Sequence, residues 1–330
     1  MSAERSKTSM SAERSKSSTS AESPVITIDG LVKRFAQVTA VDHLSLSVER
    51  GEIFGLVGPD GAGKTATMRM LAGVMRPDAG AIIIEGIDAV ADPEGVKPHV
   101  SYMPQRFGLY EDLTVDENIR FYADLFEVPP VARRERAARL LAASGMSNFG
   151  RFKAGQLSGG MKQKLGLTCA LVHAPKILLL DEPTTGVDPV SRRDFWRILY
   201  GLREEGVTIV ISTAYLDEAE RCNRLTLLHS GHALYCDTPA ALKKRMPGAL
   251  LAISSGDGRA VRTAITGEPG VSQVLLVGDG VHAVVDDAGR RIPELQAALD
   301  RAGVGFTEIV IAAPSIEDVF VALLESGDAT

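Results

Sequence analysis

Three short segments of the sequence carry residues whose types and spacing suit phosphate chemistry. The first, Gly58-Pro-Asp-Gly-Ala-Gly-Lys64-Thr65, fits the pattern G-x4-G-K-[ST] of phosphate-binding loops. Its glycines let backbone N–H groups converge on β- and γ-phosphates, and the helix expected after it presents a positive N-terminus. Lys64 adds a positive charge, and the Thr65 hydroxyl is a suitable Mg²⁺ ligand. The competing interpretation is a tight strand–helix turn that holds no ligand.

The second and third segments could complete such a site. Asp181 and Glu182 follow the apolar run Leu178–Leu180, so that one carboxylate could hold Mg²⁺ and the next could polarise an attacking water. Alone, this pair could equally begin a solvated loop. Leu157-Ser-Gly-Gly-Met161 precedes a helical pattern over 162–171, and its hydroxyl and N–H groups could bind an anion. Alone, Ser-Gly-Gly is also common in structural turns.

The elements around these segments predict an α/β fold. Alternating apolar residues predict half-buried strands, and continuous apolar runs predict strands that are covered on both faces. A helical pattern begins at Lys64, and Thr114 with Glu117 forms a capping box that predicts another helix start. Buried strands that alternate with helices favour a sandwich around a largely parallel sheet. The half-buried strands are expected at 25–28 and 44–48, and the buried ones at 53–57, 177–180 and 207–211.

The pattern changes near Pro247, after a short helix that Thr238 and Pro239 should start. From there the order of expected elements is β-α-β-β-α-β, which suggests a ferredoxin-like split βαβ unit followed by one more helix. Residues 248–330 carry five Arg, no Lys and twelve Asp or Glu, a net charge of −7 that would repel nucleic acid. The expected elements are strand 250–255, helix 258–266, strands 273–277 and 281–286, helix 291–302, strand 307–312 and helix 315–325.

Composition narrows the class of protein. The 330 residues suffice for two domains, and their net charge of −6 lacks the basic excess of a general nucleic-acid binder. No apolar run approaches the ~18 residues of a membrane-spanning helix, and the N-terminus lacks the apolar stretch of a signal peptide. Residues 1–20 are a near-duplicated polar sequence, so we expect a disordered tail over residues 1–23.

Together these segments resemble one family, the ATP-binding subunits of ABC transporters, over about residues 24–240. Five motifs occur in its usual order. Residues 58–65 resemble Walker A, Gln105 in Tyr-Met-Pro-Gln resembles the Q-loop, and residues 157–161 resemble the signature sequence. Residues 177–182 resemble Walker B with its glutamate, and Gly186-Val-Asp188 resembles the D-loop. The resemblance implies a P-loop ATP-binding domain over 24–246 with a helical subdomain at about 105–155, and an accessory C-terminal domain over 247–330.

The resemblance also implies roles for individual residues, with ATP and Mg²⁺ as cofactors. Catalysis would rest on Glu182, Lys64 and Gln105, and Mg²⁺ would be held by Thr65, Gln105 and Asp181. Asp188 would act as the D-loop residue. Nucleotide binding would involve Phe35, Gly58, Asp60, Gly61, Ala62, Gly63, Lys64, Thr65 and Ala66, with Phe35 stacked on adenine unless it is an edge-strand core residue. The signature residues Leu157, Ser158, Gly159, Gly160 and Met161 would act in trans, in a head-to-tail dimer around two ATP molecules.

Three positions depart from the family pattern. Ala214 stands where a histidine usually reaches the γ-phosphate, Ala66 replaces a common hydroxyl residue, and Asp60 adds negative charge to the loop. His229 or His232 could approach the site in space. The loss of one transition-state donor can lower a reaction rate by roughly 10²–10³ without abolishing binding. We therefore expect the departures to affect the rate of ATP hydrolysis more than the binding of nucleotide.

The combined expectation is a hydrolysing subunit on the cytoplasmic membrane face, driving a separate permease as a homodimer or heterodimer. The segments 157–164, 212–220 and 314–320 resemble the drug- and antibiotic-exporter branch. The first alternative is a catalytically weakened subunit that pairs with a competent ATPase. The second is a DNA-repair or chromosome ATPase, which the absence of a coiled-coil heptad run within 65–157 disfavours, so that we expect no nucleic-acid partner.

Overall fold

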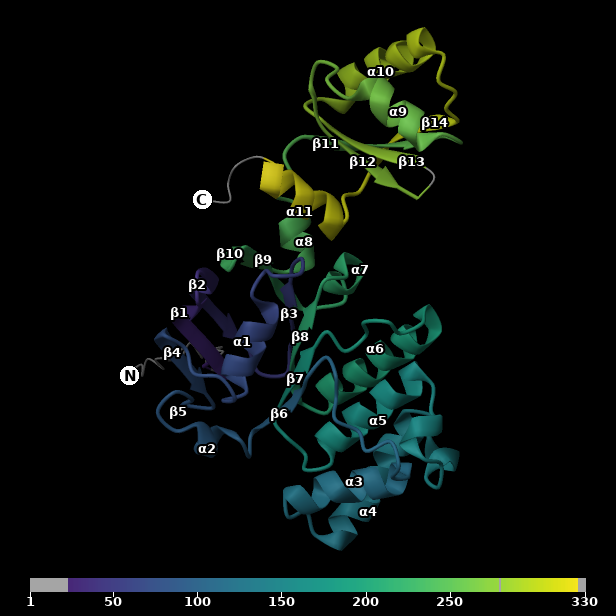
Figure 1. The fold of residues 1–330 in the computed structure, drawn as a ribbon. Helices are drawn as coiled ribbons and strands as arrows, with labels where there is room; N and C mark the ends of the chain where they lie inside the picture. Colours follow the sequence, from purple (N-terminus) through teal and green to yellow (C-terminus); the bar gives the residue numbers. More distant parts are fainter. Residues whose placement is uncertain (1–22, 279, 326–330) are drawn as a thin grey trace, which may run out of the picture.

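The computed structural model describes residues 23–278 and 280–325 (Figure 1). The disordered tail expected over residues 1–23 falls almost wholly outside the described residues. Across the two described ranges, no helix combines the length and apolar character that a membrane span requires.

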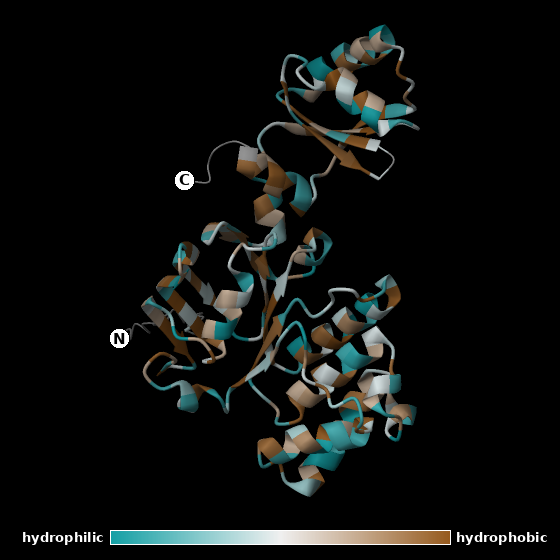
Figure 2. Ribbon diagram, viewed as in Figure 1, coloured by the Kyte–Doolittle hydropathy of each residue, from teal (hydrophilic) through white to brown (hydrophobic). Residues whose placement is uncertain are grey.

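A six-stranded sheet forms the centre of the molecule, in the order β10-β9-β3-β8-β7-β6 (Figure 1). All neighbouring strands are parallel except the β9–β10 pair. Every residue of β3, β7 and β8 is buried, which confirms the interpretation of the three apolar runs. Figure 2 shows these strands as a hydrophobic centre. The bounds are β3 Ile53–Val57, β6 Val100–Met103, β7 Ile177–Asp181, β8 Thr208–Thr213, β9 Arg224–His229 and β10 His232–Asp237.

A second, antiparallel sheet has the order β2-β1-β4-β5, and helix α1 (Lys64–Leu71) packs with it against the central sheet. Met68 of α1, Phe54 of β3 and Ile82 of β4 share one core, which joins the two sheets through the helix. The strands expected at 25–28 and 44–48 are parts of longer ones. The bounds are β1 Ile26–Phe35, β2 Val38–Val48, β4 Ala79–Ile84 and β5 Ile87–Asp88.

A helical region lies beside the central sheet and has its own core (Figure 1). The Thr114–Glu117 capping box is present and starts α3, as predicted. Helix α5 joins the regions, because some of its buried residues face the helical core and others the central sheet. The long helices are α3 Val115–Leu125, α4 Pro130–Ala143, α5 Gly159–Leu171 and α6 Pro189–Glu204. The short ones are α2 Pro93–Val96, η1 Ser147–Phe149, η2 Ala154–Gln156, α7 Leu216–Ala219 and α8 Pro239–Lys243.

A separate antiparallel sheet lies beyond α8, in the order β12-β13-β11-β14 (Figure 1). Its elements follow one another as β-α-β-β-α-β, and α9 and α10 pack with it around a separate core. The bounds are β11 Ala249–Ser254, α9 Gly258–Ile265, β12 Val271–Val277, β13 Gly280–Val285, α10 Ala288–Ala302 and β14 Glu308–Ala312.

The last helix, α11 (Ile316–Glu325), leaves this small sheet and packs on α7 and α8. Ile316, Val319 and Phe320 are buried in the same core as the central sheet. Asp318 of the same helix contacts the small sheet, since its Oδ1 lies within hydrogen-bond distance, 2.9 Å, of Nδ1 of His282 in β13. The helix expected over 315–325 is therefore present, but its apolar face belongs to the core that precedes Pro247.

Candidate functional site

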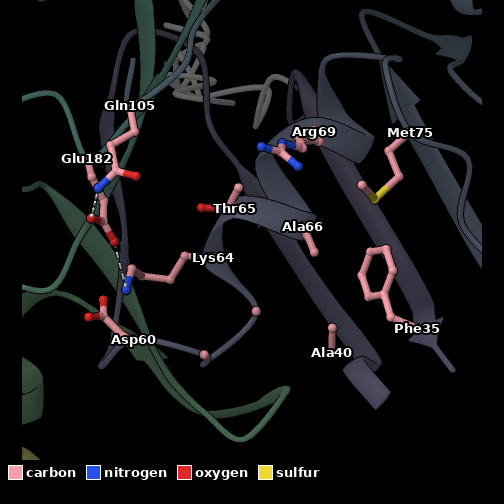
Figure 3. A pocket seen from close by; sticks show the side chains of 12 residues that line it. Phe35, Ala40, Asp60, Lys64, Thr65, Ala66, Arg69, Met75, Gln105 and Glu182 are labelled. Atoms are coloured by element: carbon pink, nitrogen blue, oxygen red, sulfur yellow. Dashed lines mark hydrogen bonds and ion pairs between the residues drawn. The ribbon is translucent and has the colours of Figure 1, made fainter. Parts of the chain in front are cut away.

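One pocket of about 440 Å³ brings together residues from five separate stretches of the chain (Figure 3). It lies at the N-terminal end of α1, where β3 ends and the glycine-rich loop begins. Its walls are formed by Phe35, Ala40, Asp60, Gly61, Gly63, Lys64, Thr65, Ala66, Arg69, Met75, Gln105 and Glu182. Nine of the residues expected from the sequence to bind nucleotide or catalyse line it.

The loop holds its conformation through glycine and through Lys64. Gly63 is the residue before α1 and has φ +100°, and a Cβ atom there would lie 2.3 Å from the carbonyl oxygen of Ala40. Only glycine fits this position. Lys64 is 4% exposed, and its Nζ donates to the carbonyl oxygens of Gly58 and Pro59 at 2.8 and 2.9 Å. The side chain therefore folds back over the loop that would hold phosphate.

Glu182 is the point on which the polar side chains converge (Figure 3). Lys64 Nζ lies 3.1 Å from Glu182 Oε1, and Gln105 Nε2 donates to Oε2 at 3.0 Å. Glu182 has φ +47°, a left-handed conformation that is unfavourable for a residue with a side chain. Its backbone N–H donates to the hydroxyl of Ser212 at 3.0 Å. A strained backbone held by specific bonds is typical of functional positions.

Asp181, at the end of β7, is 1% exposed and accepts three hydroxyl hydrogen bonds. Thr65 Oγ1 and Ser212 Oγ donate to Oδ1 at 3.1 and 2.7 Å, and Tyr102 OH donates to Oδ2 at 3.1 Å. Burial, and then the charge of Asp181, raise the pKa of Tyr102 to about 12, so this hydroxyl stays protonated. The Thr65 hydroxyl and the Asp181 carboxylate are hard oxygen donors within bonding distance of each other. Oxygen donors of this kind fit Mg²⁺.

The opposite end of the pocket is apolar (Figure 3). Phe35, at the end of β1, is 46% exposed and faces the pocket together with Ala40, Ala66 and Met75. An exposed aromatic face beside small side chains suits a flat base. The replacement of a hydroxyl residue by Ala66 thus extends the apolar wall.

The remaining expected residues do not line the pocket. Gly58 and Ala62 are buried within the loop, whereas Asp60 lines the pocket and is exposed. Leu157, Ser158, Gly159, Gly160 and Met161 lie at the N-terminus of α5, where Ser158 caps the helix and is exposed with Gly159. Asp188 caps α6 by accepting from the N–H groups of Val190 and Ser191 at 3.1 and 2.9 Å.

No histidine lines this pocket in the described part of the chain. His232 lies 3.5 Å from Asp42, and His229 packs edge-on to Phe320 of α11. Ala214 is exposed at the end of β8. The idea that His229 or His232 takes the place of the missing histidine is therefore not supported by their positions.

Ser212 and Tyr102, which hold Asp181, were not expected from the sequence. Nor were Ala40, Arg69 and Met75, which line the pocket. Tyr102 is adjacent in sequence to the Pro-Gln segment, and that nearness to Gln105 is the only signal that could have found it.

Comparisons with known proteins agree with this geometry. The sequence pattern of the family described as "ABC transporter" matches residues 41–185. The chain is 45% identical over 309 residues to "Probable multidrug ABC transporter ATP-binding protein YbhF" of Escherichia coli (strain K12), covering 91% of this chain and 52% of that protein. It thus spans about half the length of that relative. It is 32% identical to "Daunorubicin resistance ATP-binding protein DrrA2" of Streptomyces coeruleorubidus, covering 90% of this chain and 94% of that protein.

A solved structure described as an ATP binding subunit of an ABC transporter has a TM-score of 0.61 and 28% identity to this chain. The match covers 67% of this chain and 92% of that one. The identity to DrrA2 extends over nearly the whole of that protein, and the fold and the phosphate-loop pocket agree with it. The chain belongs to the family of ATP-binding proteins of ABC transporters, whose ATP-binding domain hydrolyses ATP.

Proposed function

We propose that this chain binds Mg²⁺–ATP in the pocket around Lys64 and hydrolyses it to drive a separate membrane permease. The observation that carries the proposal is the convergence of Lys64 and Gln105 on Glu182 beside the glycine-rich loop. Phosphoryl transfer depends mainly on positioning and on charge stabilisation, and these residues supply both.

Each residue has a role in this proposal. The backbone N–H groups of residues 60–65 and the Lys64 side chain bind the phosphates, and Thr65, Asp181 and Gln105 hold Mg²⁺. Glu182 polarises the attacking water, and Phe35 stacks on the adenine. Bound Mg²⁺ would neutralise charge that develops on the phosphates. Lys64 must exchange its contact with Glu182 for the phosphates when nucleotide binds.

We further propose that two such chains act head to tail, as homodimer or heterodimer. Ser158 and Gly159 are exposed and lie outside the pocket that holds Lys64, so they are free to face a phosphate bound by another subunit. The N-terminus of α5 offers N–H groups and a partial positive charge, which favour a phosphate. Asp188 would lie at the same interface.

Mixing two inactive variants tests this arrangement. Lys64→Ala disables the phosphate loop but leaves Ser158 intact, and Ser158→Arg does the reverse. In a head-to-tail dimer, the mixture contains one site built from an intact loop and an intact signature segment. Turnover should therefore reappear in the mixture and be absent from each variant alone. A mixture as inactive as its components would contradict action in trans.

A membrane permease is the proposed partner, with the chain peripheral on the cytoplasmic face and no nucleic acid involved. Tyr110, Phe121 and Leu125 are exposed apolar side chains on the helical region, and the rings of Tyr110 and Phe121 lie 4.6 Å apart. Exposed apolar clusters of this kind mark protein contacts. Phe121→Asp should abolish co-purification of a membrane protein from cells, whereas Val74→Asp, at another exposed position, should not.

The relatives' names favour export of a drug-like or hydrophobic compound, because they contain the words "multidrug" and "Daunorubicin resistance". Substrate contacts would lie in the permease. We also propose that residues 24–246 are the ATP-binding domain and that residues 247–330 are a ferredoxin-like accessory domain. The antiparallel order β12-β13-β11-β14 supports that assignment, while α11 is shared with the first domain.

A catalytically weakened subunit is the second candidate, because Ala214 carries no side chain that could reach a phosphate. The substitution Ala214→His distinguishes a slow ATPase from a non-catalytic partner subunit. If the chain is a working but slow ATPase, the added donor should raise kcat by roughly 10²-fold. If it is a non-catalytic partner subunit, the substitution should lengthen dimer lifetime while turnover stays at the level of Glu182→Gln.

A further inference from the structure

A fully buried carboxylate lies just outside the pocket. Glu218, in α7, is 0% exposed. Its Oε1 accepts a hydrogen bond from Thr184 Oγ1 at 2.7 Å, and its Oε2 accepts one from Thr213 Oγ1 at 2.9 Å. Burial of a carboxylate is costly unless its oxygens are bonded. Glu218 meets that condition by joining two chain segments that are distant in sequence.

One of these segments carries Asp181 and Glu182, and the other bonds to both of them. Thr184 lies two residues after Glu182. Thr213 directly follows Ser212, whose hydroxyl donates to Asp181 at 2.7 Å and accepts from the Glu182 N–H at 3.0 Å. The Thr213 hydroxyl also accepts from the N–H of Tyr215 at 2.9 Å, which fixes the turn that contains Ala214.

Arg192 connects the same carboxylate to the helix that follows the D-loop. Its Nε lies 3.7 Å from Glu218 Oε1, and its guanidinium lies 4.2 Å from the centre of the Tyr215 ring. Arg192 belongs to α6, which Asp188 caps. Glu218 is therefore the side chain at which Thr184 of the β7–α6 connection, Thr213 of β8 and Arg192 of α6 meet.

We propose that Glu218 is a positioning residue for ATP hydrolysis, which holds the Thr184 and Thr213 segments so that Glu182 keeps its active orientation. The strained φ of Glu182 supports this. A left-handed conformation is unfavourable for a residue with a side chain and persists only where the surroundings impose it. Glu218 holds Thr184, which follows Glu182, and the Ser212 hydroxyl bonds to Asp181 and to the N–H of Glu182 itself. These bonds hold the chain on both sides of Glu182. The inference rests on the proposed hydrolysis at this pocket.

The test compares Glu218→Gln with a matched neighbour. Gln keeps the length of the side chain but removes its charge, so the fold should persist. Asp217 is the adjacent carboxylate; it also lies 3.7 Å from Arg192, but it is 63% exposed and bonds neither threonine. Glu218→Gln should lower kcat about tenfold or more, equivalent to about 1.4 kcal/mol of transition-state stabilisation. The KM for ATP, the affinity for Mg²⁺–ADP and Tm should stay near wild type, and Asp217→Asn should behave as wild type throughout.

A double-substitution cycle gives a second readout. Thr213→Val removes one of the two hydroxyls without changing the shape of the side chain. If both residues act through one contact, the combined variant should be no slower than the slower single variant. Losses that multiply, or a normal kcat in Glu218→Gln, overturn the inference. So does a parallel fall in kcat, Tm and ADP affinity, which would indicate a structural role alone.

Different results would overturn the proposed function and the inference about Glu218. A wild-type chain with no turnover above that of Glu182→Gln overturns the proposed function and this inference with it. A wild type that hydrolyses ATP while Glu218→Gln does so equally fast overturns the inference alone.

Discussion

Gln105 Nε2 donates a hydrogen bond to Glu182 Oε2 at 3.0 Å, across 77 residues of sequence. Gln105 follows β6 and begins the connection to the helical region, whereas Glu182 follows β7 of the central sheet. The bond therefore ties the carboxylate to one of the segments that connect the central sheet with the helical region. A partner that shifts the helical region would alter the surroundings of Glu182 directly.

Removal of the Phe35 ring should weaken nucleotide binding without affecting phosphate binding. Base stacking is worth ~1–3 kcal/mol, so Phe35→Ala should raise the Kd for ATP by about 5- to 150-fold. Affinity for inorganic tripolyphosphate, which has no base, should not change. Val38→Ala, at the facing position of the same hairpin, is the control. Equal affinity for ATP in Phe35→Ala and wild type would exclude the stacking role.

A pair of glycine substitutions separates backbone strain from steric collision. Gly61 and Gly63 both have positive φ, but a Cβ atom on Gly61 meets nothing within 4 Å, whereas one on Gly63 would lie 2.3 Å from Ala40 O. Gly61→Ala should cost about 1–2 kcal/mol of unfolding free energy from φ alone. Gly63→Ala should cost more and abolish nucleotide binding. Denaturant titration measures both, and equal losses would show that the collision is relieved by movement of the loop.

The stability of the protein should fall between neutral and mildly acidic pH through His173. Burial lowers the pKa of this ring to about 4 from its ordinary 6.5, and the ring stacks on Phe126 at 3.8 Å. The unfolded chain gains a proton below pH 6.5 while the folded one does not, so this contribution is complete above 6.5 and lost as pH falls toward 4.

His173→Phe keeps a stacked ring but removes the titration. Urea unfolding at pH 7 and pH 5 should therefore show a smaller loss in this variant than in wild type. The carboxylates are common to both proteins and cancel in the comparison. A loss of equal size in the two proteins would assign the acid sensitivity to other groups.

Helix α11 should stabilise the ATP-binding core rather than the small sheet. Phe320 is 7% exposed within the central core, so Phe320→Ala should cost roughly 3–5 kcal/mol. The thermal transition whose Tm rises when Mg²⁺–ADP binds is the one whose Tm should fall in Phe320→Ala. Phe306→Ala, which alters the core of α9, α10 and their sheet, should spare that transition. A nucleotide-dependent transition unchanged by Phe320→Ala would place α11 with the small sheet.

The sequence predicted the features that are local and missed those that depend on distant contacts. The glycine-rich loop, the buried strands and the Thr114 cap follow from the order of residue types over a few positions, and each is found where expected. Helix α11 was also predictable, because its apolar face is local. The surface on which that face packs was not, since any apolar neighbour would satisfy the pattern.

The hydrogen bonds that hold the catalytic carboxylates could not be predicted from the sequence, because they also depend on distant contacts. Tyr102 and Ser212 are 79 and 31 residues from Asp181, and hydroxyl residues are too common to signal a bond across that separation. Glu218 lies in a charged stretch that suggests an exposed helix, and only the fold shows that its side chain is buried.

The central claim is that Glu182 performs ATP hydrolysis in this pocket, and comparison of wild type with Glu182→Gln tests it most directly. Steady-state phosphate release and Mg²⁺–ATP binding should be measured on the same two preparations. The account predicts turnover in wild type, loss of turnover in Glu182→Gln, and ATP binding that persists in the variant. Equal turnover in the two proteins would contradict it.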